Sequence, residues 1–297
     1  MRIWTQWSDL SAPDGITLLS PDNFPLDSAD LSQIDMYVPF YMGGAKALSY
    51  AAKMSNLKIL QMLNAGYDDA LAYLRPGLTL CNARGVHDAS TAELAVGLAI
   101  ASRRGFAEFI REQGAGTWNH RRFPSLSDSK VGIIGFGSIG KEVARKLSGF
   151  DVSITAFTQS GRDGTVKIDD LDEHLPQLDI VILILPLTDS SRHMFNAQRL
   201  AAMKDGALIV NVARGPIIDT EALLKELNSR RIYAALDVTD PEPLPNGHPL
   251  WSAPNLIVVP HVGGNSEAFE PRGRALIESQ LKLLAAGSPL EHVVAQG

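Results

Sequence analysis

The sequence predicts an α/β protein built from two doubly wound parallel-sheet domains. Its 297 residues suffice for two domains, each with a core of its own. Short β-rich segments alternate with helix-compatible segments along the chain, which is typical of parallel sheets covered by helices on both faces. The second half also contains near-continuous Val, Ile and Leu runs, as in strands buried on both faces.

The first part of the chain begins the alternation. Strands are expected at 2–5, 16–19, 35–40, 58–63 and 78–83, with a helix over 43–54. A longer helix is expected over 90–112, with Ser90 or Thr91 as its N-cap and Glu93 in its first turn. Gly, Pro and Ser residues follow this helix, and a domain junction is expected close to it.

A second series of strands follows, and the chain closes with a helix. Strands are expected at 130–137, 152–157, 179–186, 207–213, 233–238 and 255–260, and a helix over 274–287. The segment after the last strand is too short for a domain, so it is expected to fold back onto the first one. The predicted division is therefore 1–95 with 267–297 as one discontinuous domain, and 96–266 as the other.

Composition limits the classes of function. The chain is 45% hydrophobic and 20% charged, with a net charge of −6 and no large basic cluster, which argues against nucleic acid as a partner. A single cysteine, Cys81, rules out an internal disulfide and suits a reducing compartment. No signal-like or membrane-spanning segment is found, and a cytoplasmic protein is expected. No cluster has metal-ligand spacing, so no metal is expected.

A glycine-rich turn follows the strand expected at 130–137. Gly135, Gly137 and Gly140 have the G-x-G-x-x-G spacing, between an apolar strand and an amphipathic helix. The first glycine permits a tight turn, the second lets the backbone approach a pyrophosphate, and the third allows the helix to pack on the strand. The alternative is a tight turn without a ligand. The context favours a dinucleotide site, with the pyrophosphate at the helix N-terminus.

The end of the next strand bears on which dinucleotide is bound. Sites that prefer NAD place an acid there, about 20 residues after the glycines, to bind the ribose 2′-hydroxyl. Here Thr158, Gln159 and Ser160 fill these positions, and Arg162 follows. Hydroxyls and a guanidinium can bind a 2′-phosphate, so NADP is favoured over NAD. The alternative is a solvated loop that lacks an acid.

Three ionisable residues follow three strands of this second series. Arg214 ends "NVAR", Glu242 lies in "DPEPLP", and His261 follows "NLIVVP". Ligands of open parallel sheets bind at the carboxyl ends of strands, where these residues converge. Arg214 can bind a carboxylate through two parallel hydrogen bonds, and His261 can exchange a proton with a carbonyl or alcohol oxygen. Glu242 at the second ring nitrogen would raise the His261 pKa.

Each of these three residues also has a structural alternative. Arg214 could pair with Asp219 or Asp237, Glu242 could be solvated, and His261 could cap a turn. Their joint occurrence on one edge of a nucleotide-binding sheet favours hydride transfer between a nicotinamide cofactor and a 2-oxo or 2-hydroxy acid.

Several motifs together resemble one enzyme family. The segments "GIIGFGSIG", "LPLTDSSRHMFN", "NVARGPIIDTEAL", "ALDVTDPEPLP", "HPLWSAPNLIVVPHVGG" and "LNAGYDD" are similar to those of the D-isomer-specific 2-hydroxyacid dehydrogenases. Members with Thr, Ser or Arg in place of the strand-end acid, as here, resemble the glyoxylate and hydroxypyruvate reductases that use NADPH. The resemblance implies a Rossmann cofactor domain inserted in a flavodoxin-like substrate domain, and a homodimer formed through the cofactor domain.

The resemblance also implies roles for individual residues. It gives Arg214, Glu242 and His261 the catalytic roles, places Asp237 beside the nicotinamide, and makes Ala65 and Gly66, next to Asn64, a loop whose amides bind the substrate carboxylate. Met42, with Phe40 and Tyr41, could form a wall of the substrate pocket or ordinary core, and Trp118 could reach the pocket of this or a neighbouring subunit. Further cofactor contacts are expected at Ser138, Ile139, Leu185, Pro186, Val212, Ala213 and Gly263.

Two other functions remain as alternatives. Some relatives are corepressors that sense a nucleotide, and others oxidise formate or phosphite. Glu242 stands where formate dehydrogenases have Gln, and Ala65 stands where phosphite dehydrogenases have Lys, so both residues argue against these reactions. Asn64 replaces a smaller residue that is more usual in the family, and the identity of the oxo acid stays open.

Overall fold

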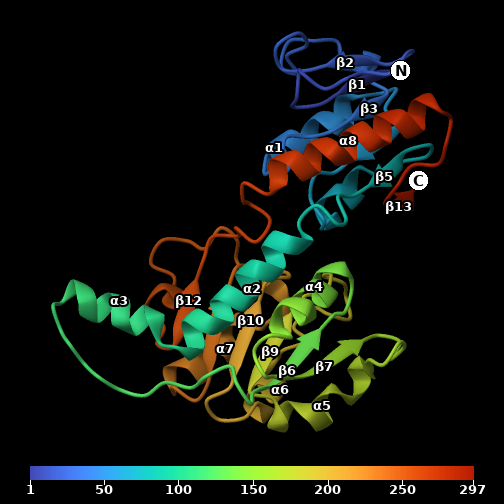
Figure 1. Ribbon diagram of the computed structural model, residues 1–297. Helices are drawn as coiled ribbons and strands as arrows, with labels where there is room; N and C mark the ends of the chain where they lie inside the picture. The colour runs from blue at the N-terminus through green and yellow to red at the C-terminus, as the bar shows by residue number, and fades with distance from the viewer. The chain divides into compact units, whose positions relative to one another are not determined.

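The computed structural model describes residues 1–297 and divides into two compact units (Figure 1). The first unit comprises Met1–His87 and Glu267–Gly297, and the second comprises Asp88–Ser266. A boundary after residue 95 was predicted, whereas the first unit ends at His87. The helix that starts at Asp88 contributes Ala92, Ala95 and Ala99 to the core of the second unit. No helix combines the length and the apolar character needed to cross a membrane.

The first unit contains a six-stranded sheet in the order β13-β5-β4-β3-β1-β2. Its strands are β1 (Arg2–Trp4), β2 (Thr17–Leu19), β3 (Met36–Tyr37), β4 (Ile59–Gln61), β5 (Thr79–Cys81) and β13 (Val293–Gln296). The first five are parallel, as predicted, whereas β13 runs antiparallel to β5. Strand β13 was not predicted from the sequence. A short C-terminal segment reaches this edge only because the preceding helix carries the chain back across the sheet.

Both faces of this sheet are covered. Alternate residues of each strand enter two different apolar clusters, so that Trp4 and Leu60 face one side while Ile3 and Ile59 face the other. Helix α1 (Gly44–Ser49) and the 3₁₀ turn Tyr50–Lys53 cover the first side. Helix α8 (Phe269–Ala285) covers the second side.

The second unit contains a seven-stranded, wholly parallel sheet in the order β12-β11-β10-β9-β6-β7-β8. Its strands are β6 (Lys130–Ile134), β7 (Ser153–Thr158), β8 (Val166–Lys167), β9 (Ile180–Leu183), β10 (Leu208–Asn211), β11 (Tyr233–Leu236) and β12 (Leu256–Val258). The strand order reverses between β6 and β9, as in Rossmann folds, and such a switch point opens a crevice for a ligand.

Helices cover both faces of this second sheet as well (Figure 1). Ile180 and Ile182 face a cluster that includes α2 (Asp88–Arg103) and α4 (Ser138–Leu147), whereas Val181 and Leu183 face the opposite cluster. That opposite face is covered by α5 (Leu171–His174), α6 (Ala197–Ala202) and α7 (Thr220–Asn228). The doubly wound architecture predicted from the sequence is therefore present in both units.

The prediction of one long helix over 90–112 is wrong in two respects. The chain forms α2, which begins at Asp88, and a separate α3 (Phe106–Gly114). Gly105 adopts a left-handed conformation with φ of +66°, which ends α2, and the ring of Phe123 fills the space where a side chain at 105 would lie. Ser90 and Thr91 lie inside the first turn of α2, so neither is the residue that precedes the helix.

Candidate active site

The turn between β6 and α4 has three glycines in three different environments. Gly135 has φ of +99°, and a Cβ there would overlap the carbonyl oxygen of Ile184 at the end of β9. A Cβ at Gly140 would overlap the carbonyl oxygen of Gly135, so the helix packs directly on the turn. A Cβ at Gly137 would meet no atom within 4 Å. The first and third glycines are thus required by the fold, whereas the space beside the second is open to a ligand.

The turn lies at the switch point of the sheet. The Cβ position at Gly135 is 3.0 Å from the Cβ of Leu185, so the segment after β9 adjoins the glycine turn. Leu185 is half-buried and Pro186 is exposed. Ser138 and Ile139 open α4, whose first amides lack intrahelical partners and can bind an anion.

The segment after β7 turns back on itself. The Thr158 hydroxyl accepts a hydrogen bond from the Gly161 backbone N–H (3.1 Å) and lies 2.7 Å from the Thr165 hydroxyl. Thr158 therefore shapes this turn. Gln159, Ser160 and Arg162 are exposed, and no acid occupies 158–162. The polar groups that are available at this strand end are an amide, a hydroxyl and a guanidinium.

Arg214 follows β10, and its backbone is fixed by a buried asparagine. The Asn211 side chain is fully buried, donates to the Arg214 carbonyl oxygen (2.9 Å) and accepts from the Ala213 N–H (3.1 Å). Val212 and Ala213 are buried as well. Gly215 adjoins the segment after β11, because a Cβ there would overlap the Thr239 carbonyl and lie 2.7 Å from the Asp240 nitrogen. The segment that carries Arg214 is thereby packed against the segment that carries Glu242.

Glu242 and His261 form a pair. The Oε1 atom of Glu242 lies 2.5 Å from Nδ1 of His261, and both side chains are more than one-third exposed. The hydrogen bond with Glu242 raises the pKa of His261 despite partial burial, and the charge of Arg214 opposes this rise. Burial alone would raise the pKa of Glu242, but the bond and charge of His261, a backbone hydrogen bond from Thr239 and the charge of Arg214 lower it.

Asp237 supports the segment that carries His261. It is buried at the end of β11, and its two carboxylate oxygens accept from the N–H groups of Val262 (2.6 Å) and Gly263 (3.0 Å). The His261 N–H donates to the Asp237 carbonyl oxygen (2.8 Å), and His261 has a left-handed φ of +51°. Burial raises the pKa of Asp237. Gly263 leaves room for this carboxylate, since a Cβ there would lie 2.8 Å from Oδ2.

Asp219 and Asp237, the two suggested partners of Arg214, both bind backbone amides. Asp219, one suggested partner of Arg214, caps α7 by accepting from the Ala222 N–H (3.1 Å). Asp237, the other, binds the two backbone amides after His261. His261 has its Nδ1 on a carboxylate, which leaves Nε2 as the ring atom able to exchange a proton with a substrate. This side of the second unit can bind an anion and transfer a proton.

In the first unit, three successive carbonyl oxygens of the segment after β4 accept hydrogen bonds. Nε2 of His87 lies 2.7 Å from the Leu63 oxygen, the Ala83 N–H donates to the Asn64 oxygen (2.9 Å), and Nδ2 of Asn82 donates to the Ala65 oxygen (2.7 Å). Within this unit the N–H groups of Ala65 and Gly66 donate no hydrogen bond. Two adjacent amides in a half-buried loop are therefore available for an anion.

The chain matches known proteins over most of its length. Residues 96–263, more than half of the chain, match the family profile "D-isomer specific 2-hydroxyacid dehydrogenase, NAD binding domain". This chain belongs to the D-isomer-specific 2-hydroxyacid dehydrogenase family. It is 36% identical over 239 residues to a hydroxypyruvate reductase of Thermotoga maritima, covering 77% of this chain and 78% of that protein.

Solved structures agree with this assignment. A D-isomer specific 2-hydroxyacid dehydrogenase family protein from Aeromonas salmonicida superposes with a TM-score of 0.85 and 27% identity, over 95% of this chain and 92% of that one. An NADPH-dependent glyoxylate/hydroxypyruvate reductase from Sinorhizobium meliloti, solved with NADP and sulfate, gives 0.82 and 26%, over 99% and 97%. The protein is thus an NAD(P)-dependent oxidoreductase of the family that acts on small 2-hydroxy and 2-oxo acids.

The residues that the sequence suggested for a wall of the substrate pocket have different surroundings in this dehydrogenase. Met42 lies in the first unit with φ of +56° and is 48% exposed, and Phe40 packs edge-on against Trp4. Tyr41 stacks on Phe269 with ring centroids 3.8 Å apart. Trp118, in the segment after α3, is 96% exposed.

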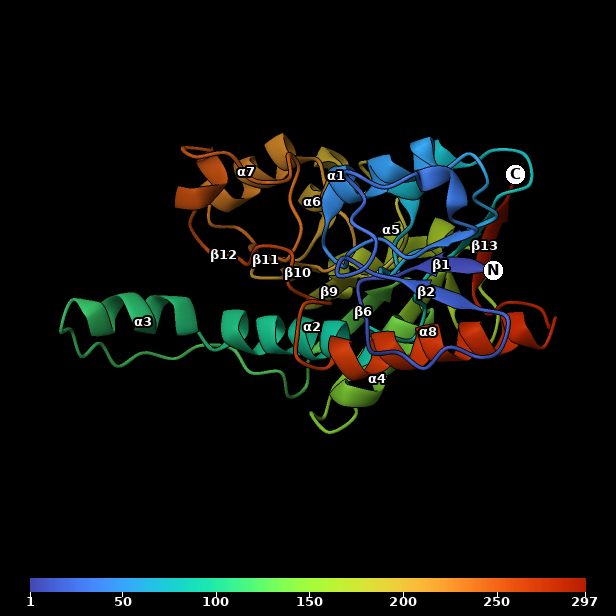
Figure 2. The same cartoon turned by 90° about the horizontal axis from the view of Figure 1, so that it is seen from above.

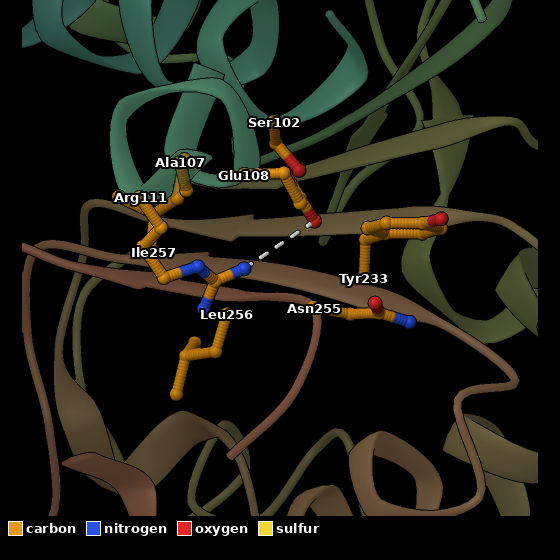
Figure 3. A pocket seen from close by; sticks show the side chains of 8 residues that line it. All are labelled: Ser102, Ala107, Glu108, Arg111, Tyr233, Asn255, Leu256 and Ile257. Carbon is orange, nitrogen blue, oxygen red and sulfur yellow. Dashed lines mark ion pairs between the residues drawn. The ribbon is translucent and has the colours of Figure 1, made fainter. Parts of the chain in front are cut away.

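A shallow hollow of the second unit lies away from these candidates (Figure 3). It is lined by residues of α2, α3, β11 and β12, including Glu108 and Arg111, which pair across 4.0 Å. Tyr233 begins β11 and Asn255 precedes β12, so the hollow lies at the amino ends of these strands. The catalytic candidates follow the carboxyl ends, and none of them lines it.

Sequence reasoning missed the residues that hold the candidates in place. Asn211, Gly215 and Asn82 have no catalytic chemistry, and their contacts are with backbone groups of other segments. The only available signal was a polar residue inside or directly after an apolar strand, as in "LIVNVAR" and "LTLCNA".

Proposed function

We propose that the chain catalyses reversible hydride transfer between NADP(H) and a small 2-oxo or 2-hydroxy acid. The observation that carries this proposal is the pair formed by His261 and Glu242, 2.5 Å apart, next to the charge of Arg214. An acid–base residue with a raised pKa, a carboxylate that orients it and a guanidinium are the groups that reduction of an oxo acid needs.

His261 is the proton donor in reduction. Glu242 at Nδ1 fixes the ring and favours the imidazolium, so that Nε2 carries the proton that the carbonyl oxygen receives. In the oxidative direction the neutral ring takes the proton from the hydroxyl group. Glu242 acts through His261 and keeps its own charge, because the same interactions lower its pKa.

Arg214 binds the substrate carboxylate. Its planar fork suits two parallel hydrogen bonds to a carboxylate, and the fixed Asn211–Arg214 turn limits how far the side chain can move. The first unit supplies donors of its own, since the N–H groups of Ala65 and Gly66 suit a carboxylate oxygen. Asn64 adjoins this loop, and Met42 precedes it in the sequence. Both are proposed to contact the substrate.

The residues around the glycine turn fit a dinucleotide. The open space beside Gly137 and the amides of Ser138 and Ile139 suit a pyrophosphate. Leu185 and Pro186 adjoin this turn, while Val212, Ala213, Asp237 and Gly263 surround the ends of β10 to β12 where the nicotinamide is expected. When bound, the nicotinamide supplies or accepts the hydride.

NADP(H) is proposed over NAD(H) because of the end of β7. An acid there would bind the 2′-hydroxyl of NAD and repel a 2′-phosphate, and none is present. Gln159, Ser160 and Arg162 are exposed and can donate hydrogen bonds to a phosphate. The Sinorhizobium meliloti reductase, which is 26% identical, is described as NADPH-dependent.

A homodimer is proposed through α3 and the segment after it. Figure 2 shows α3 projecting away from the sheet of its own unit. Phe106 and Ile110 on α3 are 48% and 66% exposed, and Trp118 in the following segment is 96% exposed, which is unusual for large apolar side chains. The neighbouring strand β12 is the edge of its sheet, with partly exposed apolar residues.

Initial rates with four oxo acids and two cofactors test this proposal. Glyoxylate, hydroxypyruvate, pyruvate and a branched oxo acid are each reduced with NADPH and with NADH. We expect turnover of a small oxo acid with a preference for NADPH. Absence of turnover for all four acids, with nucleotide binding retained in a fluorescence titration, would refute the oxo acid reductase and favour a nucleotide sensor.

A further inference from the structure

We propose that Asn82 is a positioning residue that orients the peptide between Ala65 and Gly66. This inference rests on the proposed function, in which the N–H groups of this loop bind the substrate carboxylate. Asn82 follows β5 and is 8% exposed, so it does not present its amide to solvent. Its Nδ2 donates to the Ala65 carbonyl oxygen at 2.7 Å, and its Oδ1 accepts from the Arg84 N–H at 3.3 Å.

A hydrogen bond to the carbonyl oxygen of a peptide also fixes the direction of the N–H group in the same peptide. A trans peptide is planar, so its C=O and N–H groups point in opposite directions. The bond from Asn82 to the Ala65 oxygen therefore directs the Gly66 N–H away from Asn82. The Ala83 N–H, which binds the Asn64 oxygen, directs the Ala65 N–H in the same manner. Both amides are thereby turned to the side of the loop on which no partner of the first unit lies.

Of these two carbonyls, only that of Ala65 is held by a side chain. The contact to the Asn64 oxygen comes from the backbone of Ala83 and persists in any variant at that position. The contact to the Ala65 oxygen disappears when Asn82 is replaced. Gly66 has no Cβ to oppose rotation, so the Ala65–Gly66 peptide depends on this amide for its orientation.

A buried amide network holds Asn82 itself. Nε2 of Gln61 donates to the Asn82 carbonyl oxygen (3.0 Å), and Nε2 of Gln280, on α8, donates to Oε1 of Gln61 (2.8 Å). Gln280 also binds both backbone polar groups of Glu291, at 2.9 and 3.1 Å. Gln61 and Gln280 are fully buried, and buried amides need partners for their polar atoms, so the network has one favourable arrangement.

Kinetic constants of two variants test the inference. Asn82→Asp keeps an acceptor for Arg84 but loses the donor to Ala65, whereas Asn82→Ala loses both. We expect KM for the oxo acid that the wild-type chain reduces fastest to rise about fivefold to tenfold in each variant, the loss of one hydrogen bond. The affinity for NADPH stays unchanged, because that site is in the other unit.

A matched control separates positioning from a general loss of stability. Asn23 also holds a loop of the first unit, through its Oδ1 to the Ser20 N–H (2.8 Å), but after β2. Asn23→Ala is expected to lower the thermal midpoint and to leave KM unchanged. An unchanged KM in both Asn82 variants, or an equal rise of KM in Asn23→Ala, would overturn the inference.

An NMR titration with sodium oxalate makes the test independent of catalysis. In chains labelled with ¹⁵N-glycine, the Gly66 amide signal is assigned by its loss in Gly66→Ala. We expect oxalate to shift this signal in the wild-type chain, and about fivefold to tenfold more oxalate to be needed in Asn82→Ala. That result in a chain that reduces no oxo acid would refute the proposed reaction and support the positioning role. A Gly66 amide signal that does not shift on addition of oxalate would overturn the inference.

Discussion

Replacing Gly137 by alanine separates cofactor binding from folding. Gly137 precedes α4 with φ of −73° and ψ of −160°, which an alanine also adopts, and a Cβ there meets nothing within 4 Å. Gly137→Ala should therefore change the free energy of unfolding by no more than about 0.5 kcal/mol. The new methyl group occupies the space through which a pyrophosphate approaches the helix amides.

The expected loss of affinity follows from the hydrogen bonds that the methyl group prevents. A hydrogen bond to a charged group contributes about 1.5–3 kcal/mol, and every 1.4 kcal/mol is tenfold in Kd. Loss of one amide–phosphate bond should therefore raise the Kd of NADPH at least about tenfold. Titration of NADPH fluorescence measures this Kd, and urea denaturation followed by circular dichroism measures the stability.

Gly140→Ala is the matched control in the same turn. Its Cβ would overlap the Gly135 carbonyl oxygen and lie 3.3 Å from Cγ2 of Ile184, so the backbone of the turn or the helix must move. Overpacking of this kind costs about 1–3 kcal/mol. The reasoning is refuted if Gly137→Ala binds NADPH like the wild-type chain, or if it is destabilised as much as Gly140→Ala.

Four further predictions concern the catalytic candidates and the dimer. Arg214→Lys should raise the KM for the oxo acid with little change in the Kd of NADPH, because an ammonium cannot form the bidentate contact; an unchanged KM would remove Arg214 from the carboxylate site. His261→Asn should lower kcat about 10²–10⁴-fold with nucleotide affinity retained, and wild-type turnover would mean that another group handles the proton. Since Glu242 raises the pKa of His261, reduction by the wild-type chain should fall as the pH rises through that pKa, and in Glu242→Gln the fall should occur at lower pH; identical pH profiles would contradict this assignment. Ile110→Asp should shift the mass measured by light scattering from dimer to monomer, whereas Lys141→Asp, on the exposed side of α4, should not; a dimeric Ile110→Asp would place the interface elsewhere.

Local pattern was sufficient for every strand except β8 and β13, and for the parallel arrangement of the others. Runs such as "IVIL" and "LIVN" are buried at every position, as expected for strands covered on both faces, and their spacing implied crossover helices between them. The glycine turn could also be located in this way, because its glycine spacing lies between an apolar strand and an amphipathic helix. These patterns can be read within short segments of the sequence.

Local pattern misled where a distant residue decides the conformation. The helical periodicity of 90–112 continues across Gly105, but this glycine adopts a left-handed φ, and the ring of Phe123 occupies the space where its side chain would lie. The antiparallel strand β13 was missed for a similar reason. Its pairing with β5 depends on where the chain lies after α8, and the hydrophobic periodicity of the sequence carries no information about this position.

For the candidate site, the sequence by itself determined which chemical groups follow which strands. Parallel strands end on one edge of a sheet, so Arg214, Glu242 and His261 could be grouped from their positions alone. Only the tertiary structure decided how they are held: that Glu242 lies 2.5 Å from Nδ1 of His261, and that Asp237 binds two backbone amides. Gln61 and Gln280, 219 residues apart, meet in the buried network behind Asn82. Hydrogen bonds require alignment within a few tenths of an ångström, and such alignment is a property of packed segments and not of sequence spacing.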